Sequence, residues 1–182
     1  MTETRSHAPE PGPISVLFHP STVPVVDIFR CIGSFEDQYD LALLNGPEQA
    51  LLGLTRPEAA KAIVSDALLL AFALDRQRSR PLNYAPLKSR HGSLDEYCLV
   101  ALIAAARRPD SELAFEAASV LGIASLDLMT SLAADLVRQI DLGGLTFGTP
   151  GLQEFRGVVG DRALFTDDLE VCLDRSELRF RF

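Results

Sequence analysis

The sequence predicts a mainly α-helical fold with minor β content (α+β): an orthogonal helical bundle that carries a small C-terminal antiparallel β element. Apolar residues recur at helical spacing between about residues 22 and 142, and residues that open or end helices stand at the expected places. Near the end of the chain, short alternating apolar runs are instead typical of strands. The sequence therefore predicts a helical body over about 22–142 and a β element over about 145–182.

Chain length and the first residues predict the domain organisation. A chain of 182 residues suits one domain. Residues 1–13 contain three prolines and no apolar run, so we expect a disordered tail there and a single globular domain over 14–182. The absence of an apolar leader also favours a cytoplasmic location.

Composition and net charge limit the classes of partner that the sequence predicts. Apolar residues make up 47% of the chain, enough for a sizeable core, and the formal net charge is −8. An acidic chain is a poor match for phosphate-rich surfaces, so nucleic-acid binding is disfavoured and no membrane partner is expected. The three cysteines stand far apart without a C-x-x-C pair, which argues against a disulfide framework and a zinc site. No cofactor or metal is implied.

The first helices are predicted from their caps. Residues 14–19 form a short extended run, and Ser34 is expected to cap a helix that stops at Asn45-Gly46. The segment 55–58 (TRPE) has the spacing of a capping box and opens a helix to about Asp75. Within that helix residues 67–74 are apolar on every side, so we expect it to be the central buried helix.

Later helices follow an irregular connection over residues 76–92. The segment 93–96 (SLDE) is a second capping box, and its helix should end before Pro109. Asp110 or Ser111 caps a helix that stops at Gly122. Ser125 opens a last helix before Gly143-Gly144, and one stripe of that helix is apolar: Met129, Leu132, Ala133, Leu136, Val137 and Ile140.

The last 38 residues are expected to be strands. Val158-Val159, a Gly160-Asp161 turn and residues 163–165 predict a hairpin. Residues 169–173 and 178–182 predict a second pair. In the final strand Arg179, Phe180, Arg181 and Phe182 alternate, which indicates either an edge strand protected by its arginines or an edge that a partner covers.

One segment resembles a known motif. Residues 116–126 (EAASVLGIASL) resemble the core of helix-turn-helix DNA-binding modules, because the small Ala118, the turn Gly122 and the apolar Ile123 fall at that motif's spacing. The resemblance implies a DNA-binding helix pair over 111–141. With its flanks it implies a winged-helix-like segment at 93–147.

The charges of that segment depart from the family. A recognition helix needs hydrogen-bond donors for base edges and cations for phosphates. The corresponding helix here carries Asp127 and Asp135, which phosphates repel. The alternative interpretation is a plain helical hairpin turn with the same packing requirements.

A second candidate is a local reversal of charge. Six residues of an acid-free stretch form a candidate anion- or partner-binding site: Arg76, Arg78, Arg80, Lys88, Arg90 and His91. Such a cluster can bind a phosphate-bearing ligand or an acidic partner. The ordinary alternative is a solvated connector whose cations complement a helix C-terminus.

A third candidate is a reactive group near a helix start. His91, Asp95 and Cys98 lie close in sequence, and a nucleophilic cysteine needs a nearby base and a lowered pKa. Because Cys98 continues into an apolar run, a core position is the simpler expectation. No catalytic residue is assigned.

These observations rank three functions. A non-enzymatic adaptor or protein–protein interaction module, with a protein partner or a second copy of the chain, is expected first, by elimination. A helix-turn-helix regulator that uses residues 111–141 is the alternative, although charge disfavours DNA. A small enzyme with a site near His91, Asp95 and Cys98 is third.

Overall fold

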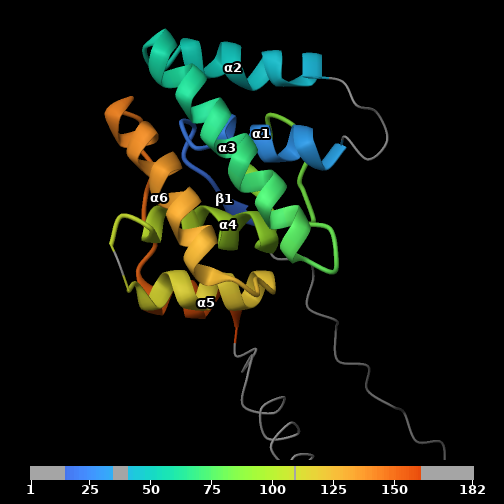
Figure 1. The fold of residues 1–182 in the computed structure, drawn as a ribbon, viewed down its shortest axis with the longest axis vertical. Helices are drawn as coiled ribbons and strands as arrows, with labels where there is room; N and C mark the ends of the chain where they lie inside the picture. Colours follow the sequence, from blue (N-terminus) through green and yellow to red (C-terminus); the bar gives the residue numbers. More distant parts are fainter. Residues whose placement is uncertain (1–14, 35–40, 109, 161–182) are drawn as a thin grey trace, which may run out of the picture.

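The chain is mostly helical, as predicted. The computed structural model describes residues 15–34, 41–108 and 110–160 (Figure 1). Within them the helices are α1 (Val23–Gly33), the 3-10 helix η2 (Leu41–Leu44), α2 (Asn45–Leu52), α3 (Pro57–Gln77), α4 (Leu94–Ala105), α5 (Glu112–Leu121), α6 (Leu126–Leu142) and α7 (Leu152–Val159). The tail predicted over residues 1–13 lies outside the described residues.

The central helix is α4, and every residue from 95 to 105 is buried. It packs against α5 and α6. The capping box predicted at its start is confirmed: the Ser93 hydroxyl accepts from the Glu96 amide at 3.1 Å, and the Glu96 carboxylate accepts from the Ser93 amide at 2.7 Å. A helix that is apolar nearly all round can be stable only where neighbours cover every face.

That central place was predicted for α3, and the prediction is wrong. The helix has the expected bounds, but Leu69 is 55% and Phe72 is 44% exposed. Helix α3 packs against α1, α2 and α6, and its buried residues lie on one side: Ala59, Ala60, Ile63, Ala67, Leu70, Ala71 and Leu74. Apolar composition alone therefore did not distinguish a one-sided helix from a buried one.

Helices α3 and α6 lie side by side in opposite directions (Figure 1). At one end the Thr55 hydroxyl donates to the Gly143 carbonyl at 2.7 Å, and at the other the Gln77 side chain accepts from the Ser125 amide at 2.9 Å. Thr55 was expected to cap α3. Its hydroxyl instead satisfies the last turn of α6, and Arg56 occupies the cap position without a side-chain bond.

The corner between α5 and α6 forms as the sequence predicts. Gly122 ends α5 in the left-handed conformation (φ 70°), and the Ile123 amide donates to the Ala118 carbonyl at 3.0 Å. This hydrogen bond satisfies one of the backbone carbonyls that lack an intrahelical donor at the end of a helix. The apolar stripe of α6 is confirmed: Met129, Ala133, Leu136, Val137 and Ile140 are buried and Leu132 packs against the core.

The sheet among the described residues is not C-terminal, which corrects the prediction. Strand β1 (Val16–Leu17) pairs antiparallel with β2 (His91–Gly92), with Val16 opposite Gly92. A Cβ on Gly92 would lie 2.1 Å from the Phe18 ring, so this close pairing requires glycine. The sheet ties the N-terminal segment to the chain before α4.

The predicted hairpin start at Val158-Val159 is also wrong, because both residues lie in α7. Phe155 and Val159 recur at helical spacing and are buried, and the Phe155 ring stacks on Tyr97 with centroids 5.6 Å apart. Tertiary packing of that face favours a helix over a hairpin. The other predicted strands, 169–173 and 178–182, lie outside the described residues.

Two further boundaries differ from the predictions. Asn45 begins α2 instead of ending a helix, since Pro47 in the first turn needs no N–H partner there. Residues 145–151 after α6 contain no strand, so the wing of a winged helix is not formed in that described stretch. The predicted β element over 145–182 is thus coil and helix as far as residue 160.

Candidate functional site

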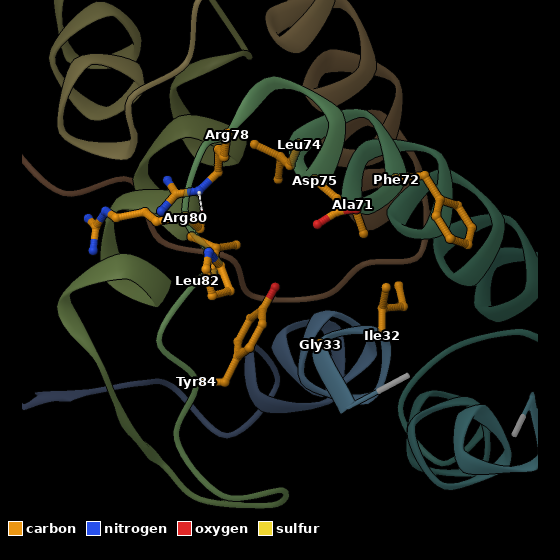
Figure 2. Close-up of a pocket in the computed structure, with 11 residues that line it drawn as sticks. Ile32, Gly33, Ala71, Phe72, Leu74, Asp75, Arg78, Arg80, Leu82 and Tyr84 are labelled. Carbon is orange, nitrogen blue, oxygen red and sulfur yellow. Dashed lines mark hydrogen bonds between the residues drawn. The ribbon is translucent and has the colours of Figure 1, made fainter. Parts of the chain in front are cut away.

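The structure brings two of the predicted basic residues together and disperses the others. Arg78 and Arg80 both approach the buried Asp95 carboxylate, with N–O distances of 3.9 and 3.4 Å. They belong to residues 78–93, which join α3 to α4 and include β2; this segment is here called the connection. Both residues contribute to the lining of a cavity beneath the connection, and Figure 2 shows their side chains directed away from its interior.

The remaining predicted residues do not converge on that cavity. Arg76, Lys88, Arg90 and His91 are exposed, and none of them is among the residues that line it. The Arg90 side chain donates to the Phe18 carbonyl at 3.2 Å. The predicted basic site is therefore dispersed: the Arg78 side chain is buried beside Asp95, and the other five residues are exposed.

Buried carboxylates hold the backbone of the connection. Each accepts from a backbone amide that has no regular partner: Asn83 donates to Asp95 at 2.9 Å, Ala85 to Glu96 at 3.2 Å, and Lys88 to Asp27 at 3.0 and 3.1 Å. An irregular segment needs such acceptors because its own amides lack secondary-structure bonds. The three carboxylates thus fix the shape of the connection.

Arg30 is at the centre of this network, with a side chain that is 1% exposed. Its guanidinium donates to Glu96 at 2.6 Å, to Asp27 at 2.9 Å and to the carbonyl of Ser89 at 2.9 Å. Burial by itself lowers the pKa of Arg30, but its hydrogen bonds to Glu96 and Asp27 outweigh that effect and raise it. All these groups satisfy one another, so the network is structural.

Beneath the connection lies a cavity of about 190 Å³, here called the connection cavity (Figure 2). It lies between the end of α1, the last turns of α3 and the connection. Its lining is mostly apolar and includes Ile32, Ala71, Leu74 and Leu82. The cavity is too small for a drug-sized ligand, for which about 300 Å³ is a minimum, and suits a small molecule.

Four polar residues also belong to the lining of this cavity: Asp75, Arg78, Arg80 and Tyr84. The Tyr84 hydroxyl points into it, and the Asp75 carboxylate faces it from α3 (Figure 2). Arg78 is 3% exposed; it donates to the carbonyls of Arg80 at 3.2 Å and of Leu121, while its second terminal nitrogen has no hydrogen-bond acceptor among the described residues. Burial lowers the pKa of Arg78, and the charge of Asp95 opposes that effect.

The end of α1 approaches the cavity closely. A Cβ on Gly33 would lie 2.3 Å from the Tyr84 ring, so the backbone of α1 forms the wall against which that ring is held. A larger residue at position 33 would move the ring. Gly33 therefore positions Tyr84.

A second hollow, the α5–α6 groove, lies on another face. The two helices are bent by 111° relative to each other, and the groove between them has a volume of about 760 Å³. Phe115 in its lining is 60% exposed. The charged groups among the described lining residues are mainly acidic: Asp110, Glu112 and Asp127, with one cation, Arg108.

The predicted reactive group is not assembled for chemistry. Cys98 is completely buried, and burial raises the pKa of its thiol to about 12, so it stays protonated and unreactive at neutral pH. Asp95 accepts from the connection, and His91 is exposed on β2. No group of three or more His, Cys, Asp or Glu side chains in the described part of the chain is arranged to hold a metal ion.

Sequence reasoning missed Arg30, Asp27, Tyr84 and Asp75. Arg30 and Asp27 are three apart on a helix whose other residues are mostly apolar, and an ion pair at that spacing in such a context signals burial. No local signal identifies Tyr84 or Asp75. Residues Arg179, Phe180, Arg181 and Phe182 lie outside the described residues.

Comparison with known proteins gives no relative: no family model, no curated protein and no solved structure matches this chain. Across the described residues, no single helix is long and apolar enough to cross a membrane, and α5 with α6 reaches that length only as a bent pair.

Proposed function

We propose that the protein is a non-enzymatic adaptor whose α5–α6 groove binds a basic, amphipathic segment of a partner protein. The observation that supports this proposal is an exposed aromatic ring, Phe115, in a groove bordered by more acids than bases. Interfaces are anchored by aromatic residues in hollows, and a charged rim selects partners of opposite sign.

The size of the groove supports a segment of polypeptide as the occupant. A volume of about 760 Å³ exceeds the connection cavity severalfold, and the groove is open along two helices. An amphipathic helix can place its apolar face on Phe115 and Leu126, while its lysines or arginines face Asp110 and Asp127. Glu112 forms an ion pair with Arg156 of α7, with an N–O distance of 2.7 Å. Among the described residues, no cation lies within 4.0 Å of the Asp110 or Asp127 carboxylate, so these two acids are available to a partner.

Site-specific photocrosslinking in native cells tests the proposal. A photoreactive phenylalanine analogue replaces Phe115, and a matched chain carries it at Leu142, which is 61% exposed at the far end of α6. We expect crosslinks only from position 115, to a peptide in which basic residues flank apolar ones. A synthetic copy of that peptide should bind about tenfold more weakly to Phe115→Ser and more weakly at high salt.

The other outcomes contradict the adaptor function. Equal crosslinking from both positions would show a non-specific contact. An acidic crosslinked peptide would contradict the charge argument, and a crosslink to a second copy of this chain would indicate self-association instead of a partner.

A second candidate function is DNA binding through α5 and α6. The 111° bend, the buried Ala118 and the left-handed Gly122 agree with helix-turn-helix geometry. The exposed Asp127 opposes phosphate contact. Fluorescence anisotropy with mixed-sequence duplex DNA at low salt separates the two functions: salt-dependent binding that Arg138→Gln weakens supports DNA, and no binding at low salt excludes it.

A further inference from the structure

Separately from the adaptor function, we propose that the connection cavity binds a small primary amine, in its protonated form, that carries a short branched apolar body. The ammonium group lies between the Asp75 carboxylate and the Tyr84 hydroxyl, and the apolar body lies against walls supplied by α1, α3 and the connection. Three observations support this site: two oxygen-bearing side chains without partners that face it, two helix C-termini beside it, and its apolar walls.

The Asp75 carboxylate on α3 and the Tyr84 hydroxyl on the connection both face the interior of the cavity (Figure 2). Among the described residues, neither side chain forms a hydrogen bond, and no cation lies within 4.0 Å of Asp75. Asp75 is exposed to solvent, so a ligand can reach it in the folded protein. An ammonium group has three N–H donors and no acceptor, so both oxygens are suitable partners for it.

The charge that faces the interior is negative. Figure 2 shows the Arg78 and Arg80 side chains directed away from it, and both approach Asp95, with N–O distances of 3.9 and 3.4 Å. Burial raises the pKa of Tyr84, so its hydroxyl stays uncharged at neutral pH. Among the described lining residues, Asp75 is thus the charged side chain directed into the cavity, and it attracts a cation.

Two helices end beside the cavity. Ile32 and Gly33 are the last residues of α1, and Leu74 and Asp75 lie in the last turn of α3. A helix C-terminus carries a partial negative charge of about half an elementary charge, which favours a cation within the last turn. The cation in the last turn of α3, Arg76, is exposed and lies outside the lining. The two helix dipoles therefore act in the same direction as the charge of Asp75.

The other walls fit a branched aliphatic group. Ile32, Ala71, Leu74 and Leu82 supply apolar surface from three segments of the chain. Each CH₂ or CH₃ group that moves from water to such walls contributes favourably to binding. The cavity volume of about 190 Å³ limits the ligand to a few carbon atoms beyond its head group.

Charge also separates a simple amine from an α-amino acid. In an amino acid the carboxylate is attached to the carbon that carries the ammonium group, so it would lie close to the Asp75 carboxylate and be repelled. The arginines of the lining do not offset this repulsion, because their guanidinium groups are directed away from the interior. The site is therefore assigned to an amine without a neighbouring carboxylate.

Three probes that share one branched carbon skeleton test the proposal on the full chain: 3-methylbutan-1-amine, 3-methylbutan-1-ol and L-leucine. Titrations at neutral pH are followed by amide chemical shifts, which report where each probe binds. We expect saturable shifts at residues around the cavity for the amine. Binding of the neutral alcohol and of L-leucine should be at least about tenfold weaker.

Variants with matched controls then locate the site. Asp75→Asn removes the charge that faces the cavity, and Asp66→Asn makes the same change on α3 outside the lining. Tyr84→Phe removes the hydroxyl, and Tyr97→Phe makes that change on α4, also outside the lining. We expect Asp75→Asn to weaken binding of the amine about tenfold and Tyr84→Phe about threefold, and both controls to leave it unchanged.

Each contrary result overturns the proposal. No saturable shift for the amine shows that the cavity is only a packing defect. Equal binding of the alcohol removes the role of the carboxylate, and equal binding of L-leucine contradicts the assignment to a simple amine. Unchanged binding to a folded Asp75→Asn protein places the probe elsewhere, and circular dichroism of each variant establishes that it is folded.

Discussion

An arginine bound by two carboxylates has different consequences in two parts of this molecule. Around Arg30, on α1, a guanidinium binds Glu96 and Asp27 with all three side chains at most 8% exposed. On α7, Arg156 binds Glu112 and Glu116 with side chains that are 25–67% exposed. Water competes for the second cluster and is excluded from the first. An arginine with two carboxylates is therefore part of the network that fixes the backbone of the connection in one place, and forms solvent-exposed surface ion pairs in the other.

The largest expected effect is at the buried cluster. Glu96→Gln removes the charge that faces Arg30 at 2.6 Å and weakens the bonds to the Ala85 and Ser93 amides. Because the remaining charge is buried and only partly compensated, we expect a loss of about 3–5 kcal/mol in the free energy of unfolding. Urea denaturation monitored by circular dichroism measures it. A loss below about 1 kcal/mol would show that water reaches the network.

Alkaline pH should lower the free energy of unfolding through Cys31, which lies next to Arg30 on α1. Burial, together with the charge of Asp27, raises the pKa of Cys31 from 9.0 to about 11. The unfolded chain loses this proton first, so the contribution to stability is complete below pH 9 and is lost as the pH rises toward 11. We expect Cys31 to contribute a decrease on the order of 2 kcal/mol across that interval. Burial raises the pKa of Cys98 as well, to about 12, so that thiol adds to the same slope. Urea unfolding at several pH values measures the slope, which Cys31→Ala should reduce but not abolish; an unchanged slope would assign the effect to other groups.

A smaller effect is expected at the corner between α5 and α6, where backbone conformation acts instead of charge. Gly122 has φ 70°, and a Cβ there meets no atom within 4 Å. Gly122→Ala should therefore cost about 1 kcal/mol through left-handed strain alone. Thermal unfolding compares it with Gly53→Ala at φ −74°, which should be neutral or slightly stabilising. Equal effects at both positions would contradict this explanation.

The smallest effect should come from the exposed cluster. Glu112→Gln makes the same chemical change as Glu96→Gln, on a side chain that is 67% exposed and paired with Arg156. Screening by water and salt leaves such an exposed pair with only a small contribution to the free energy of unfolding. The ratio of the two Glu→Gln effects in one denaturation series tests the comparison directly, and similar losses would refute it.

Local signals predicted much of the helical frame and little of the site. The starts of α3, α4 and α6 and the end of α5 follow from prolines, a capping box and a glycine within a few residues of each boundary. The cavity could not be predicted this way. Arg78 and Tyr84 meet Ala71 and Gly33 only because α1, α3 and the connection pack together.

By itself, the sequence determined where most helices begin and end, because capping and apolar periodicity act over one or two turns. Only the tertiary structure decided that α4 and not α3 is fully buried, that Val158 and Val159 are helical, and that Arg30 is enclosed. The physical reason is distance along the chain: the partner of Arg30, Glu96, is 66 residues away, and burial depends on which faces the other helices cover.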